Sequence, residues 1–115
     1  MGKAKTIVVL GMMGRCPFGG QTWLYLNWLQ GLRRLGHDVW YVEDDSVWPF
    51  DPLQNTTTDD CSYAVAHLKA SCERIGLNDR WVYRLSDRKG ACWGVSESQL
   101  AELYQSTDVL LNIVG

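Results

Sequence analysis

Apolar positions along the chain occur in two patterns, short continuous runs and longer runs with a spacing of three or four residues. The continuous runs predict four β-strands, at residues 6–10, 38–43, 81–85 and 108–114. The spaced runs predict three helices, at residues 21–35, 59–75 and 96–105. Strands that alternate with helices are typical of an α/β fold with a parallel sheet. We therefore expect a Rossmann-like sheet with the strand order 3-2-1-4 and helices on both faces.

The first helix has an apolar stripe that we expect to face the sheet. The stripe consists of Leu24, Trp28, Leu32 and Leu35. Gly36 follows as a left-handed stop, and Gly31 would let the helix approach the sheet closely. Trp28 is accordingly predicted to belong to the core, as are Trp40 and Trp81 within the expected strands.

The other two helices carry equally clear signals. In the second helix, the apolar stripe consists of Val65, Leu68, Cys72 and Ile75, and Gly76 ends it. Ser96 and Gln99 match a capping box that would begin the third helix. A long connection at residues 44–58 separates the second strand from the second helix, and loops of this length often have a function.

Composition narrows the classes of function. The chain has 115 residues and a net charge of −2, without the basic patch that nucleic-acid binding requires. The four cysteines form no C-x-x-C pair, so we expect neither a zinc site nor a disulfide framework, and no resident metal or cofactor. The first apolar run is too short for a signal peptide or a membrane span. These features predict a cytoplasmic protein.

A glycine-rich segment joins the first strand to the first helix and predicts an anion site. Free backbone N–H groups and the positive end of a helix dipole would converge there, an arrangement that favours phosphate. The spacing of Gly11, Gly14, Gly19 and Gly20 does not match the dinucleotide motif G-x-G-x-x-G. In the P-loop motif, Gly20 would replace the lysine, which argues against nucleoside triphosphate hydrolysis. The residues that we expect at the phosphates are Gly19, Gly20, Gln21 and Thr22.

Other candidate binding residues lie at the carboxyl ends of the strands, where ligands of open α/β sheets bind. We expect Glu43 and Asp44 to bind hydroxyl groups, with Asn112 at the end of the last strand. Trp48 in the long connection would offer an apolar stacking surface. His37 lies at the opposite edge and His67 within the second helix, so neither is assigned as a general base. The catalytic residues are not identified.

Two segments together resemble a known family. Pro17-Phe-Gly-Gly20, continued to Leu35-Gly-His-Asp-Val39, and the final segment at residues 108–115 are similar to the N-terminal region of GT-B-fold glycosyltransferases of the family 1 and family 4-like type. The resemblance implies an enzyme with two Rossmann-like domains that transfers a sugar from a nucleotide-sugar donor to an acceptor. It implies that this chain is the acceptor-side portion, that Gly19 and Gly20 approach the donor phosphates, and that the C-terminal donor domain is absent. The chain alone would then be inactive.

Two other interpretations remain. The chain could be a nicotinamide- or flavin-binding half-domain of an oxidoreductase or epimerase. It could also be a non-enzymatic module that dimerises through the edge of its fourth strand, since no helix follows this strand to cover its apolar surface. The same uncovered strand leads us to expect an incomplete domain.

Overall fold

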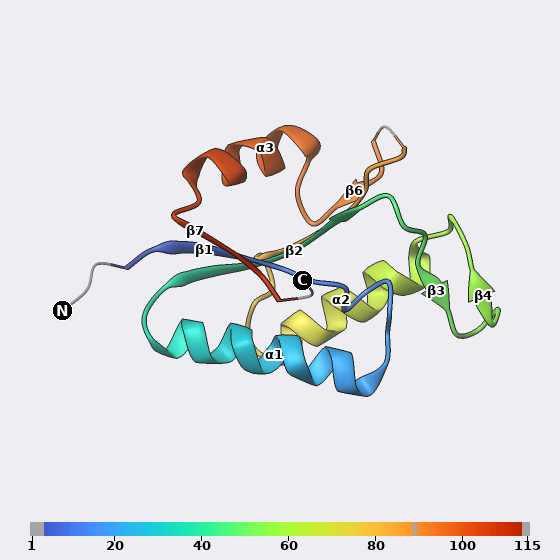
Figure 1. Cartoon of the computed structure of the whole chain (residues 1–115), viewed down its shortest axis with the longest axis horizontal. Coiled ribbons are helices and arrows are strands. Elements are labelled where there is room, and N and C mark those ends of the chain that lie inside the picture. Colours follow the sequence, from blue (N-terminus) through green and yellow to red (C-terminus); the bar gives the residue numbers. More distant parts are fainter. Residues whose placement is uncertain (1–3, 89, 114–115) are drawn as a thin grey trace.

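A five-stranded sheet forms the centre of the computed structural model, which describes residues 4–88 and 90–113 (Figure 1). Its strands are β1 (Thr6–Leu10), β2 (Asp38–Asp45), β5 (Trp81–Leu85), β6 (Cys92–Trp93) and β7 (Val109–Asn112). They lie in the order β6-β5-β2-β1-β7. The α/β class is confirmed. The expected order 3-2-1-4 counted four strands and did not include β6. The four expected strands pair in parallel, and β6, which pairs antiparallel with β5, makes the sheet mixed.

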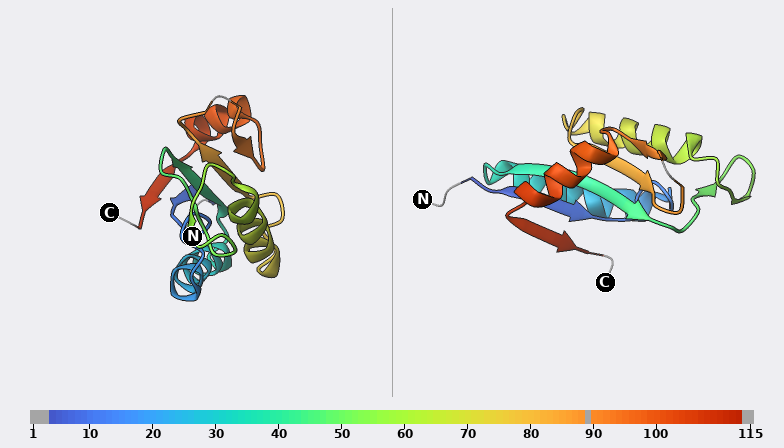
Figure 2. Two further views of the ribbon diagram at one scale, coloured as in Figure 1. Left: turned by 90° about the vertical axis from the view of Figure 1, so that its right-hand side faces the viewer. Right: turned by 90° about the horizontal axis from the view of Figure 1, so that it is seen from above.

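Helices cover the sheet on both faces (Figures 1 and 2). The helices α1 (Gly19–Arg34) and α2 (Ser62–Arg74) lie on one face, and α3 (Glu97–Ser106) lies on the other. Successive side chains of the strands point to opposite faces of the sheet. Val8, Val42 and Val82 pack against α3, while their neighbours Ile7, Val9 and Tyr41 belong to the larger core beneath α1 and α2.

Helix α1 uses a different face from the expected one. Its buried residues are Thr22, Tyr25, Leu26 and Leu29. Trp28 is 46% exposed and Leu35 is 73% exposed, so the prediction that their stripe faces the sheet, with Trp28 in the core, is wrong. Both sets of residues have helical spacing, and only the docking of α1 on β1 and β2 distinguishes them. Gly31 has open space around it, so the expected close approach to the sheet is wrong as well.

The structure confirms several other predictions about the helices. Leu68 and Cys72 are fully buried in α2, although this helix begins at Ser62 rather than at residue 59. Gly36 and Gly76 have φ values of +92° and +78°, as their stop roles require. The capping box of α3 is present in full.

The long connection after β2 contains a small antiparallel hairpin, β3 (Phe50–Asp51) paired with β4 (Thr56–Thr57). At the other end of the chain, β7 stops at Asn112, and the expected end of the strand at Val114 lies outside the described residues. Within the part of the chain that the structure describes, no helix has the length and apolar character needed to cross a bilayer.

Candidate functional site

The glycine-rich connection leads from the carboxyl end of β1 to an open helix N-terminus. Phe18 occupies the N-cap position in an extended conformation and provides no side-chain cap, and the first turn of α1 contains no acidic residue. Gly19 and Gly20 are the first two residues of the helix, and a Cβ at either position would meet no atom within 4 Å. The first N–H groups of the helix thus remain available to an anion together with the positive end of the dipole.

The Glu43 side chain holds residues 14 and 15 of the glycine-rich connection through hydrogen bonds. Its side chain is 3% exposed, and both oxygens accept backbone hydrogen bonds: Oε1 from the Gly14 N–H and Oε2 from the Arg15 N–H at 3.2 Å. The Tyr41 hydroxyl donates to Oε1 at 2.7 Å and accepts from the Met13 N–H at 2.7 Å. Residues 13–15 are therefore held by two side chains of β2, and the Glu43 carboxylate, expected to bind ligand hydroxyls, is engaged inside the protein.

Glycine at position 14 suits this close packing. A Cβ there would lie 3.1 Å from Oε1 of Glu43 and 3.2 Å from the Ala64 carbonyl oxygen. A larger residue would therefore require these neighbours to shift by a few tenths of an ångström.

Burial changes the acid–base properties of this network. Removal of Glu43 from water raises its pKa to about 7, against the opposing effect of the hydrogen bonds from Gly14, Tyr41 and Arg15. The pKa of the Tyr41 hydroxyl is also raised, first by burial and then by the charge of Glu43. The loop therefore depends on a carboxyl group that titrates near neutral pH.

Asp44 and Asp45 connect the end of β2 to its surroundings. Asp44 forms an ion pair with Arg84 at 2.8 Å and accepts a hydrogen bond from the Tyr104 hydroxyl at 2.8 Å. Asp45 forms an ion pair with Arg15 of the glycine-rich loop at 2.7 Å. Because each oxygen of Asp44 accepts one of these hydrogen bonds and a carboxylate can accept about four, Asp44 retains capacity for a ligand hydroxyl.

One contact at the site was missed by sequence reasoning. The Oγ1 of Thr22, in the first turn of α1, lies 2.9 Å from Nε2 of His67 in α2, and Tyr63 stacks on the His67 ring. Burial lowers the pKa of His67, so the fold favours the neutral imidazole. Nothing in the sequence relates these positions, which lie 45 residues apart; only the packing of α1 beside α2 brings them together.

The remaining candidate residues divide between two ends of the carboxyl edge. Asn112 is exposed on β7 and pairs in register with Leu10 of β1, close to the glycine-rich loop. Trp48 donates its indole N–H to Asp87, which follows β5. Since β5 and β7 are three strand spacings apart, or about 14 Å, Trp48 and Asn112 lie at separate positions along this edge.

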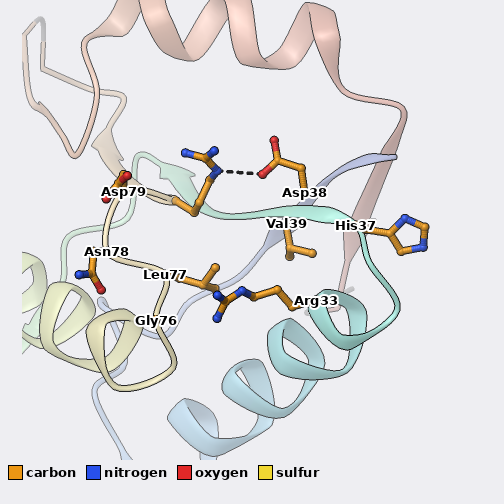
Figure 3. A pocket seen from close by; sticks show the side chains of 9 residues that line it. Arg33, His37, Asp38, Val39, Gly76, Leu77, Asn78 and Asp79 are labelled. Carbon is orange, nitrogen blue, oxygen red and sulfur yellow. Dashed lines mark hydrogen bonds and ion pairs between the residues drawn. The ribbon is translucent and has the colours of Figure 1, made fainter. Parts of the chain in front are cut away.

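A separate hollow of about 360 Å³ lies at the opposite, amino edge of the sheet (Figure 3). Arg33 and the Arg80–Asp38 ion pair line it, and His37 lies beside it at the start of β2. The length of β2 places this hollow about 20 Å from the carboxyl edge. As expected, His37 is therefore remote from the glycine-rich loop.

Comparisons with known proteins add no family to this picture: no family model, curated protein or solved structure matches the chain. Among residues 4–88 and 90–113, no group of three or more His, Cys, Asp or Glu side chains is placed to hold a metal ion.

Proposed function

We propose that the chain is the acceptor-side, N-terminal portion of a GT-B-fold glycosyltransferase, with its sheet forming the beginning of a Rossmann-like domain. The observation that carries the proposal is the open N-terminus of α1, which lies at the carboxyl edge of parallel strands and has no side-chain cap or acidic residue in its first turn. Diphosphate groups favour such a position. A donor-binding domain in cis would complete the cleft, so the isolated chain is expected to bind but not to catalyse.

Each candidate residue has a role in this proposal. Gly19, Gly20 and Gln21 present backbone N–H groups to the donor phosphates of a nucleotide-sugar, and the buried Thr22 supports this turn through its contact with His67. Asp44 and Asn112 accept hydrogen bonds from hydroxyl groups of the substrates, and Trp48 offers a stacking surface to the acceptor. Glu43 acts through the loop that it orders, so its role is positioning.

A pair of substitutions at Gly20 tests the site. Neither Gly20→Ala nor Gly20→Asp creates a steric conflict, because the position faces open space. The aspartate places a negative charge in the first helical turn, which favours the helix but repels a diphosphate. With uridine diphosphate as the probe, titration followed by NMR should show that Gly20→Asp weakens binding by about tenfold or more, while Gly20→Ala binds as the parent does.

Equal binding by both variants, or no binding by the parent chain, would contradict the proposal. Transfer of sugar by this chain alone would also contradict the expectation that it is inactive. Tight binding of a nicotinamide or flavin cofactor, seen in its absorbance, would favour the oxidoreductase or epimerase interpretation instead.

A second candidate function is association with another protein surface, as expected of a dimerising module. Two observations favour it. Leu24, Trp28 and Leu35 leave an exposed apolar stripe on α1. Among the described residues, β7 is an edge strand of the sheet, and its Leu110 is exposed. Exposed apolar patches of this kind often mark interaction surfaces.

A further inference from the structure

A second pocket, outside the glycine-rich loop, lies between α2 and the side chains of Arg88 and Trp93. Its volume is about 570 Å³. Val65, Ala66 and the half-buried Trp93 form an apolar wall, while Ser62, Lys69 and Arg88 add polar groups. Trp93 is held in place by pairing with Tyr83 across the β5–β6 ladder and by ring packing at 6.1 Å.

The polar groups of this pocket that are available to a ligand are the cationic side chains of Lys69 and Arg88. Asp60 is engaged, because its Oδ1 accepts from the Ser62 N–H at 3.0 Å and from the Ser62 hydroxyl at 2.6 Å. Asp59 contacts Arg88 only at 3.5 Å, and both side chains are about half exposed, so this ion pair is weak. Within the described part of the chain, no carboxylate lies within ion-pair distance of Lys69.

We infer that this pocket binds an anionic sugar, a hydroxylated ring that carries a carboxylate or phosphate group. The apolar face of such a ring fits against the Trp93 indole, and its negative group fits between Arg88 and Lys69. Pockets that combine an apolar wall with a few convergent polar groups are typical small-ligand sites. Arginine forms strong, charge-assisted hydrogen bonds with carboxylate and phosphate, and such a ligand would replace the weak contact with Asp59.

The test compares three probes on the intact chain by NMR titration. Glucuronate and glucose 6-phosphate should bind with dissociation constants on the order of 1 mM and shift the Trp93 indole signal, which Trp93→Phe identifies by removing it. Neutral glucose should bind about tenfold more weakly. A stronger response to glucuronate or to glucose 6-phosphate identifies which anionic group the pocket prefers.

Charge variants complete the test. Arg88→Gln and Lys69→Gln should each weaken binding of the anionic sugars by about tenfold, whereas Arg74→Gln, at the far end of α2, should have no effect. Asp59→Asn should strengthen binding, because it releases Arg88. Equal affinity for glucose and glucuronate, no shift of the Trp93 signal, or the absence of saturable binding at that signal would overturn the inference. These outcomes are read at Trp93, so phosphate bound at the N-terminus of α1 does not affect them.

Discussion

Glu43 shows how a single side chain can decide the shape of a candidate site. The sequence places a carboxylate at the carboxyl end of the second strand, which was predicted correctly. Its burial could not be predicted, because a polar residue at a strand end is usually solvated. Only the fold brings the N–H groups of Gly14 and Arg15 to its oxygens and the Tyr41 hydroxyl beside them.

The raised pKa of Glu43 predicts a specific dependence of stability on pH. The folded protein holds the proton up to about pH 7, whereas the unfolded chain releases it near pH 4.5. The Glu43 contribution to the free energy of unfolding should therefore be largest below pH 4.5 and should fall, by on the order of 3 kcal/mol, as the pH rises to about 7. Urea unfolding of the parent and of Glu43→Gln across this range measures the effect.

Glu43→Gln should lose this pH dependence, while Glu102→Gln, at an exposed position of α3, should retain it. The same slope in the parent and in Glu43→Gln would show that another group is responsible. His67 contributes in the opposite direction, because its lowered pKa reduces stability as the pH falls through the range of free histidine.

Helices and strands were predictable wherever local pattern and burial agree. The bounds of β1 and β5 match the apolar runs because both strands are enclosed between helical layers. Helix α1 was predicted as an element, but its buried face was not, since Tyr25 and Leu29 have the same helical spacing as Trp28 and Leu32. The two-residue strand β6 has no pattern of its own and forms only by pairing with β5.

The capping box of α3 gives a prediction at the level of a helix. Ser96 accepts from the Gln99 N–H at 3.1 Å, and the Gln99 side chain accepts from the Ser96 N–H at 2.9 Å. Ser96→Ala should lower the free energy of unfolding by about 1 kcal/mol, because it leaves a helix N–H without its partner.

Ser96→Asp provides the matched control for this measurement, since aspartate is an equally good N-cap. Equal losses in the two variants in thermal or urea unfolding would mean that the cap does not stabilise α3.

The molecule as a whole has an uneven distribution of apolar surface. On the face that carries α1 and α2, the side chains of Val109, Leu111 and Ile113 are only partly buried, and the apolar stripe of α1 remains exposed. This arrangement could not be deduced from the periodicity of α1, which predicted that the same stripe was covered. It indicates a surface suited to further protein contact.

We expect substitutions on the exposed stripe of α1 to change association without changing the fold. Trp28→Gln combined with Leu35→Gln should reduce self-association measured by light scattering, while the melting temperature changes little because both side chains are largely exposed. Leu53→Gln, on a distant and more exposed turn, should leave association as it is. A monomeric parent chain would contradict this prediction.

The two edges of the sheet differ in a way that limits how copies could assemble. β6 ends one side as a two-residue antiparallel strand, which offers little backbone to template another chain. Within the described part of the chain, β7 leaves a longer edge unpaired on the other side. When two copies join through β7, each copy uses its one long edge in the contact. Growth by strand addition through β7 then stops at a closed pair, which disfavours an open-ended fibre.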